Sequence, residues 1–294
     1  MLNQNINEPF IGVVPHRLRK YKNLGDLELS KLDSTNNPLS NAKKIKDLDS
    51  NDHIIIYPSS NIWLMRTHRL KCNISLVIVE PKVVHKKYYN LINLLRYKFF
   101  RIFIRYHEIA NKYNNVQATT LCDTWVLGAS RAGNDSKQKL ISLIASEKNK
   151  YTGHKLRHQA IKKIQQFGDI QVDILGRGYA PFTNKEDGLK PYMFSIIIEN
   201  CQEVDYFTEK LVDCFLCGTL PIYWGAPNIE QYIDMKGVIT FRTLDELTAI
   251  LAHLSKREYY ERHEALLRNQ QWAKELKKIS ENVIDSIRLI LSSP

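Results

Sequence analysis

Short apolar runs alternate with amphipathic stretches along most of the chain. Several runs, such as HIIIY at 53–57 and SLVIV at 75–79, are nearly continuous in Ile, Val and Leu, which is typical of parallel strands buried on both faces. This alternation predicts an α/β fold with parallel sheets. The expected strands cover residues 52–58, 75–80, 99–105, 139–145, 171–175, 192–199, 220–224 and 237–241. The expected helices cover residues 86–97, 154–167, 208–217, 244–254 and about 258–291.

The chain has 294 residues, enough for two compact domains. A polar segment at 128–139 (GASRAGNDSKQK) interrupts the apolar periodicity and is the expected seam between them. We therefore expect one α/β domain at 1–128 and a second at 129–270. Residues 271–294 form the end of an amphipathic helix whose apolar stripe should dock on the body of the protein.

The net charge and the cysteines exclude few classes of function. The formal net charge of +11 favours an anionic partner, such as a nucleotide, a nucleic acid or an anionic membrane, and does not choose among them. Cys214 and Cys217 form a C-x-x-C without a second pair, which favours buried thiols over a zinc site. With no long apolar run and no signal-peptide pattern, we expect a cytoplasmic protein, or one weakly associated with the cytoplasmic face of a membrane.

The segment 192–225 (YMFSIIIENCQEVDYFTEKLVDCFLCGTLPIYWG) predicts a strand, a polar loop, a helix from about Thr208 and another strand. Such a loop lies at the carboxyl end of the sheet, where open α/β folds bind ligands, and the helix N-terminus can hold a phosphate. Lys210 opposes the helix dipole at a cost of roughly 0.3–1 kcal/mol, which favours a bound anion beside it. Glu209 is an acceptor suited to ribose hydroxyls. Alone, both residues could equally be ordinary surface side chains.

Three linked blocks of this segment, EN at 199–200, DYFTEK at 205–210 and GTLPIYWG at 218–225, resemble the signature of glycosyltransferase family 10, the α-1,3/4-fucosyltransferases. The resemblance extends over about residues 140–241. It implies a GT-B fold, in which two Rossmann-like domains face each other across a cleft and the C-terminal one holds GDP-fucose. It also implies transfer of L-fucose to a hydroxyl of an acceptor glycan, for example α-1,3 to an N-acetylglucosamine or glucose unit.

The resemblance implies a set of donor-binding residues in the C-terminal domain. Arg157 would neutralise the diphosphate, since a guanidinium binds phosphate oxygens bidentately, although an exposed helix face would also explain an arginine there. Gly176 lies in a segment (QVDILGRG, 171–178) similar to a family strand and turn. Met193 and Cys201 depart from the family pattern. The full set is Arg157, Gly176, Glu199, Asn200, Tyr206, Thr208, Glu209 and Lys210.

Family members invert the anomeric centre, and that displacement needs a base to accept the proton of the acceptor hydroxyl. By resemblance the base is a glutamate at the end of a strand in the N-terminal domain, and Glu80 is the first candidate. Glu108 and His85 are weaker candidates. Glu80 could instead be a structural carboxylate before the next helix.

The D-x-D at 47–49 matches the metal-binding mark of GT-A transferases, but no strand precedes it, so a solvated loop is expected. We expect no metal or other cofactor, because the cations named above would replace magnesium. One rival is a GT-B transferase that uses another nucleotide sugar. Another is a non-catalytic basic module that binds nucleic acid or membrane, for which residues 88–113 offer mixed aromatic and basic side chains. If the chain is a fucosyltransferase, we expect no nucleic-acid partner.

Overall fold

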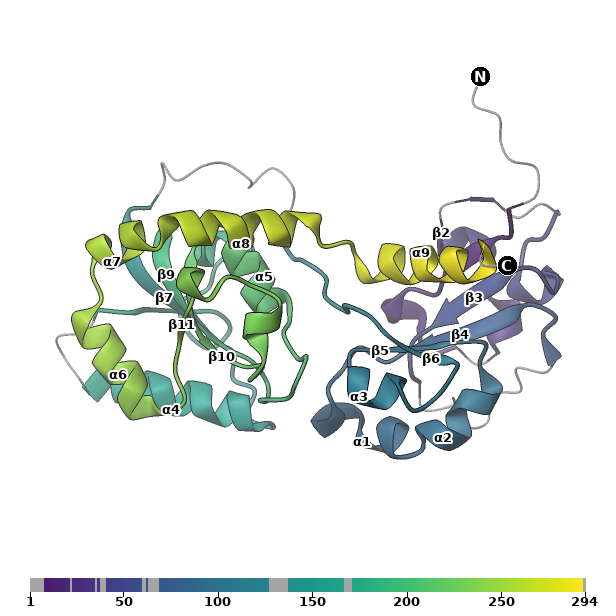
Figure 1. Ribbon diagram of the computed structural model, residues 1–294, viewed down its shortest axis with the longest axis horizontal. Coiled ribbons are helices and arrows are strands. Elements are labelled where there is room, and N and C mark those ends of the chain that lie inside the picture. The colour runs from purple at the N-terminus through teal and green to yellow at the C-terminus, as the bar shows by residue number, and fades with distance from the viewer. Residues whose placement is uncertain are drawn as a thin grey trace, which may run out of the picture. The chain divides into compact units, whose positions relative to one another are not determined.

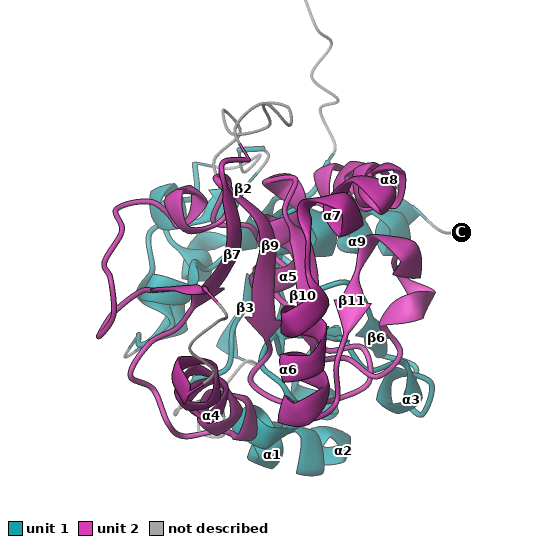
Figure 2. Cartoon of the chain, turned by 90° about the vertical axis from the view of Figure 1, so that its left-hand side faces the viewer, with its two compact units in different colours: residues 1–121, 278–294 teal, residues 122–277 magenta. Residues whose placement is uncertain are grey.

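The computed structural model describes residues 8–21, 23–34, 36–37, 41–59, 62, 69–126, 137–166 and 171–292. Its contacts divide the chain into two compact units, which Figure 2 shows in different colours. Unit 1 consists of residues 1–121 and 278–294, and unit 2 consists of residues 122–277. Within the part of the chain that is described, no helix is long and apolar enough to cross a membrane.

Unit 1 contains a six-stranded sheet in the order β2-β1-β3-β4-β5-β6. β2 pairs antiparallel with β1, and every other neighbouring pair is parallel. The carboxyl ends of the parallel strands therefore meet at one edge of the sheet. The strands are β1 (Ile11–Val13), β2 (Asp33–Ser34), β3 (His53–Ile56), β4 (Asn73–Val77), β5 (Ile102–Ile104) and β6 (Val116–Ala118).

Alternate residues of these strands enter two separate apolar cores, one on each face of the sheet. Ile54 and Ile56 of β3 pack under α1 and α2, whereas Ile55 between them packs under α9. Figure 1 shows α1 and α2 along one side of this sheet and α9 along the other. The helices of unit 1 are α1 (Lys82–Asn90), α2 (Ile92–Leu95), α3 (His107–Ala110) and α9 (Ile279–Ser292).

Unit 2 contains a five-stranded parallel sheet in the order β11-β10-β9-β7-β8. Every residue of the central strand β9 is buried, as its continuous apolar sequence predicts. The strands are β7 (Lys139–Ile144), β8 (Asp173–Leu175), β9 (Tyr192–Ile198), β10 (Leu220–Trp224) and β11 (Ile239–Thr240). The helices are α4 (Thr152–Gln166), α5 (Glu209–Leu216), α6 (Leu244–His253), α7 (Lys256–Glu261) and α8 (His263–Glu275).

Short 3-10 helices connect several of these elements. The two used below are η6, directly after α2, and η9, directly before β9 along the chain. The described ones are His16–Leu18, Leu24–Asp26, Leu29–Lys31, Ile45–Asp47, η6 (Arg96–Lys98), η9 (Lys185–Gly188), Ile229–Gln231 and Met235–Gly237.

The C-terminal part of the chain differs from the single helix expected at 258–291. It forms α7, α8 and α9, and α8 ends where Leu276 adopts an extended backbone. Trp272 of α8 packs on aromatic rings of unit 2, whereas Val283 of α9 is fully buried in a core of unit 1. The apolar stripe is continuous in sequence, yet its two halves fill different cores.

The unit boundaries also differ from those expected at 128 and 270. The chain enters unit 2 at Cys122. Directly after it, the Thr124 hydroxyl and the Trp125 backbone N–H donate hydrogen bonds to the carboxylate of Asp213 in α5. It returns to unit 1 at Lys278 rather than ending in an appended helix. Most of the expected seam, residues 128–136, lies outside the described residues.

Candidate functional site

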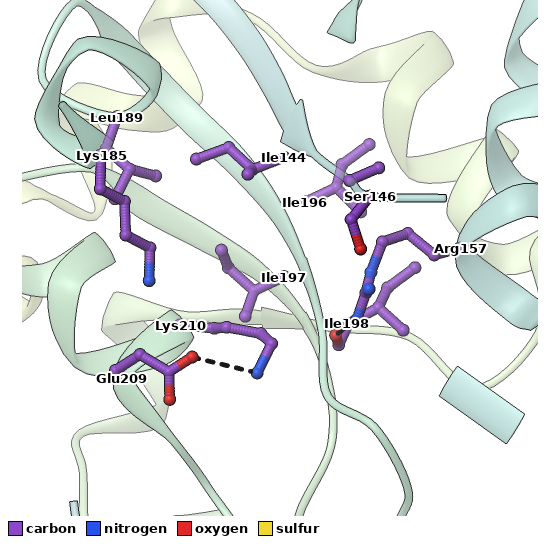
Figure 3. Close-up of a pocket in the computed structure, with 11 residues that line it drawn as sticks. Ile144, Ser146, Arg157, Lys185, Leu189, Ile196, Ile197, Ile198, Glu209 and Lys210 are labelled. Carbon is purple, nitrogen blue, oxygen red and sulfur yellow. Dashed lines mark hydrogen bonds and ion pairs between the residues drawn. The ribbon is translucent and has the colours of Figure 1, made fainter. Parts of the chain in front are cut away.

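A cavity of about 190 Å³ lies in unit 2 at the carboxyl ends of β7 and β9. Side chains from five successive parts of the unit line it, as Figure 3 shows. This is the position at which open parallel sheets bind ligands. The lining residues are Ile144, Ala145, Ser146, Arg157, Lys185, Leu189, Ile196, Ile197, Ile198, Glu209 and Lys210.

Three cationic side chains converge on this cavity. Arg157 comes from α4, Lys185 from η9 and Lys210 from the first turn of α5. In Figure 3 their charged ends lie around Ile197, and Glu209 contacts Lys210 at 3.4 Å. Three cations and one carboxylate line the cavity, and the buried carboxylates of Glu199 and Asp213 pair with Lys210 and Lys185 from behind, so an anionic ligand would share these two cations with them.

Glu199 holds the start of α5 from inside. Its side chain is 0% exposed, and its Oε1 accepts hydrogen bonds from the Thr208 backbone N–H at 2.8 Å and from the Thr208 hydroxyl at 2.9 Å. Its Oε2 lies 3.2 Å from the Lys210 ammonium group. A buried carboxylate is tolerated only when it is paired in this way. We therefore assign Glu199 and the N-cap Thr208 to positioning Lys210 rather than to direct ligand contact.

The charge states around the cavity follow from this pairing. Burial by itself would lower the pKa of Lys210, but Glu199 and Glu209 outweigh it and raise that pKa above its usual value. Burial would likewise raise the pKa of Glu209, but Lys210 and Lys185 reverse the effect and lower it. Burial lowers the pKa of Arg157, but a guanidinium remains charged in proteins. All these groups are therefore ionised at neutral pH.

Arg157 lies at the end of β9 because α4 starts against the strand. Its Nη2 donates a hydrogen bond to the Ile198 carbonyl oxygen at 2.5 Å, and Arg157 as a whole is only 7% exposed. The predicted exposed-face alternative is therefore wrong. At the start of α4, the Gly153 backbone N–H donates to the Asn200 carbonyl at 2.9 Å, and a Cβ on Gly153 would lie 1.7 Å from the Glu199 carbonyl oxygen. Only glycine fits there.

Lys185 and Gly153 were not among the residues predicted from the sequence. The Lys185 ammonium group lies 2.8 Å from the carboxylate of Asp213, which is 0% exposed. Burial raises the pKa of Asp213, and Lys185 and Thr124 oppose that rise. In sequence Lys185 stands in the polar run NKEDGLK, which looks like any surface loop. The apolar neighbours of Asp213 in α5 were the available signal, since a buried carboxylate needs a cation.

Five of the eight predicted donor-binding residues do not line the cavity, and Glu199 and Thr208 are two of them. Tyr206 is 2% exposed, inside the core of unit 2. Asn200 is half-buried beside Gly153. Gly176 has φ +114°, and a Cβ there would lie 2.0 Å from the Ala145 carbonyl, so it shapes the loop that carries one wall of the cavity. Of the predicted residues, Arg157, Glu209 and Lys210 are those that line it.

The candidate bases lie in unit 1. Glu80 is half-buried, three residues beyond the end of β4, and Pro81 after it is the N-cap of α1. Glu108 pairs with Lys112 at 3.2 Å on the surface. Burial lowers the pKa of His85 to about 4, and its Nδ1 is buried without a hydrogen-bond partner among the described residues. The assignment of Glu80 as base stays a prediction.

The two remaining sequence motifs are the D-x-D at 47–49 and the C-x-x-C at 214–217. Asp47 accepts hydrogen bonds from the backbone N–H groups of Lys43 and Lys44 at the start of the 3-10 helix Ile45–Asp47, and Asp49 accepts one from that of Asn51. Both aspartates are exposed, but the first belongs to a short helix and not to the expected loop. Cys214 and Cys217 are buried, and burial raises the pKa of Cys217 to about 12. Within the described ranges, no three His, Cys, Asp or Glu side chains gather as a metal site would require.

Residues 134–287, just over half of the chain, match the family model described as glycosyltransferase family 10 (fucosyltransferase), C-terminal part. The α-(1,3)-fucosyltransferase FucT of Helicobacter pylori is 34% identical over 74 residues, covering 24% of this chain and 16% of that protein. The 4-galactosyl-N-acetylglucosaminide 3-α-L-fucosyltransferase 9 of Mus musculus is 27% identical over 130 residues, covering 41% of this chain and 34% of that protein. The matched parts therefore span well under half of these curated relatives.

Solved structures establish the fold class. A crystal structure of an α1,3-fucosyltransferase with GDP-fucose aligns with a TM-score of 0.51 at 16% identity, covering 81% of this chain and 78% of that one. Alr3699/HepE of Anabaena in complex with UDP aligns with a TM-score of 0.58 at 8% identity, covering 84% and 80%. Together with two α/β units built on parallel sheets, these likenesses confirm the predicted GT-B class.

Proposed function

Because the chain belongs to glycosyltransferase family 10 (fucosyltransferase), we propose that it transfers L-fucose from GDP-fucose to a hydroxyl group of an acceptor glycan. An N-acetylglucosamine or glucose unit, linked α-1,3, is the acceptor we favour. The observation that carries the proposal is the convergence of Arg157, Lys185 and Lys210 on one cavity at the carboxyl edge of a parallel sheet. A nucleoside diphosphate sugar carries the negative charge for such a site, and its diphosphate group is the part that the cavity would hold.

In this proposal the diphosphate of the donor lies among the three cations. Lys210 is held by Glu199 and Lys185 by Asp213, so both ammonium groups are already in place before the ligand arrives. Charges that need no reorganisation stabilise a leaving group more effectively than mobile ones. Glu209, ionised and at the rim of the same cavity, is suited to accept hydrogen bonds from ribose hydroxyls.

The proposed reaction is a single displacement with inversion at the anomeric carbon. The acceptor oxygen forms a bond to the anomeric carbon. The bond between that carbon and the β-phosphate oxygen breaks, and its electron pair leaves with GDP. The proton of the acceptor hydroxyl goes to a carboxylate, for which Glu80 is the candidate. Arg157, Lys185 and Lys210 stabilise the charge that grows on the departing diphosphate. We propose that these cations serve where other transferases use a metal ion.

Donor binding is tested by thermal unfolding of the chain with GDP-fucose, GDP, UDP-glucose and UDP-N-acetylglucosamine. A ligand that binds the native state raises the apparent stability. We expect stabilisation by the two guanine nucleotides and little by the uridine nucleotides. The reverse order would favour a transferase that uses another nucleotide sugar, and no stabilisation by any of them would favour a non-catalytic module.

Turnover is tested with GDP-fucose and a panel of glycan acceptors, with and without EDTA. Replacing Glu80 by Gln should leave GDP binding intact and lower kcat on the order of 10²–10⁴-fold, because the proton acceptor is lost. Glu28→Gln, which removes an exposed carboxylate of the same unit that is no candidate for the base, is the control and should be near wild type. A Glu80→Gln enzyme with normal kcat would overturn the base assignment, and loss of activity in EDTA would overturn the metal-independent chemistry.

A further inference from the structure

An exposed face of unit 1 combines apolar and cationic side chains in a way that the proposed reaction does not use. It is formed by α1 and α2, which Figure 1 shows on one side of the unit 1 sheet, and by η6, which directly follows α2 in the chain. We refer to the exposed residues of 82–98 as the α1–α2 face. We propose that the α1–α2 face docks the protein on a membrane surface that contains anionic lipids.

Four large apolar side chains of this face are exposed. Val83, Leu91, Leu94 and Tyr97 are 46%, 39%, 60% and 75% exposed, which places four of the ten large exposed hydrophobic residues of the described chain within fifteen positions. The buried residues of the same helices, such as Ile92 and Leu95, already fill the core under the sheet. The exposed ones are therefore surplus to folding, and clustered exposed apolar side chains mark an interaction surface.

The charge of this region is equally one-sided. Residues 82–98 contain five Lys or Arg and no Asp or Glu, so this segment carries a formal charge of +5. Lys86 and Lys87 are exposed and pair with no carboxylate among the described residues. Arg96 lies over the ring of Tyr97 at 4.0 Å from its centroid, so this aromatic side chain also carries a positive charge at its surface.

Exposed apolar and basic side chains occur together along this whole segment. Positions 83, 87, 90, 94 and 97 are all exposed, and the chain between them turns at His85 and at Leu91, where the backbone is not helical, before it enters η6. Basic groups beside Leu and Tyr are the pattern of helices that lie in the plane of a membrane surface. A nucleic acid would use the cations but has no contact to offer Val83, Leu91 or Leu94, so anionic lipid is the better match.

The test is co-sedimentation of the full chain with vesicles of phosphatidylcholine alone or of phosphatidylcholine and phosphatidylglycerol in equal parts. We expect binding to the anionic vesicles that weakens as salt is added, because surface charges are screened. Lys86→Gln with Lys87→Gln should weaken vesicle binding on the order of tenfold, since each basic residue near an anionic surface contributes several-fold. Lys277→Gln with Lys278→Gln removes the same charge from an exposed pair outside the face and should leave binding unchanged.

The apolar contribution has its own matched pair. Leu94→Ser with Tyr97→Ser should weaken vesicle binding about tenfold or more through lost apolar burial. Leu289→Ser with Leu291→Ser replaces side chains that are 69% and 42% exposed on α9, across the sheet, and should have no effect. All variants replace exposed residues, so circular dichroism should match wild type.

Two outcomes would overturn the proposal: equal vesicle binding by the α1–α2 and control variants, or binding of an RNA oligonucleotide that competes with vesicles and survives Leu94→Ser with Tyr97→Ser. Neither readout needs donor binding or turnover. The proposal can therefore fail or hold independently of the proposed transferase activity.

Discussion

The two units treat their buried polar groups differently. In unit 2 the charges around the cavity are paired inside the protein: Glu199 with Lys210, and Asp213 with Lys185. In unit 1 seven buried side-chain polar atoms have no hydrogen-bond partner among the described residues, including Nδ1 of His53 and of His85 and Oγ of Ser75. Unpaired buried polar atoms cost free energy that pairing would recover.

The difference fits two different tasks. A site that recognises one invariant ligand gains from charges held in place beforehand, since no binding energy is then spent on ordering them. In unit 1 a partner that supplied the missing hydrogen bonds would recover the free energy lost at these atoms. The same contrast appears at the helix starts: α5 has a Thr208 N-cap bonded to Glu199, whereas α1 begins at Pro81 with no side-chain cap.

The largest effect is expected from breaking the paired network of unit 2. Lys210→Ala leaves the carboxylate of Glu199 buried without its cation, which should lower the free energy of unfolding by about 3 kcal/mol. It should also abolish measurable GDP binding in calorimetry. Lys210→Arg keeps the charge and serves as control. If Lys210→Ala binds GDP as wild type does, the cavity is not the diphosphate site.

Acid should destabilise unit 1 through His53. Burial lowers the pKa of His53 to about 4, whereas in the unfolded chain it titrates near 6.5, so the unfolded state takes up the proton first. Stability from this residue is present above pH 6.5 and is lost as the pH falls towards 4, by up to about 3 kcal/mol.

Chemical denaturation at pH 7 and pH 4.5 measures this loss. His53→Leu should have a flatter pH dependence than wild type, and His253→Leu, which replaces an exposed histidine of α6, should not. Equal pH dependence in all three proteins would mean that the unpaired imidazole of His53 is not what makes unit 1 sensitive to acid.

The smallest effect is expected from replacing Thr208, the N-cap of α5. Thr208→Ala removes the hydroxyl that donates to Glu199 and accepts from the Lys210 backbone, at a cost of about 1–2 kcal/mol. Thr208→Ser keeps both bonds and should lie within about 0.5 kcal/mol of wild type, since only a methyl group is lost. Thermal or denaturant unfolding measures both, and a Thr208→Ala protein as stable as wild type would show that Glu199 alone sets the start of α5.

Several features were predictable because local sequence carries them. Continuous apolar runs identified the buried strands of unit 2, and the polar loop before Thr208 placed the start of α5 to within one residue. Glu209 and Lys210, picked out by their position in that first helical turn, do line the cavity. These inferences work because strand burial and helix caps depend on neighbours in the chain.

Other features depend on residues far apart in the sequence. Lys185 faces the cavity because it pairs with Asp213, Glu199 turns inward because Thr208 and Lys210 bond to it, and Gly153 is required because α4 starts against the Glu199 carbonyl. The apolar stripe from Trp272 to Ile287 is one pattern in sequence but belongs to two cores. Sequence thus determined which segments form strands and helices and where a phosphate could bind. Only tertiary structure decided which charges meet, because pairing depends on distance in space rather than along the chain.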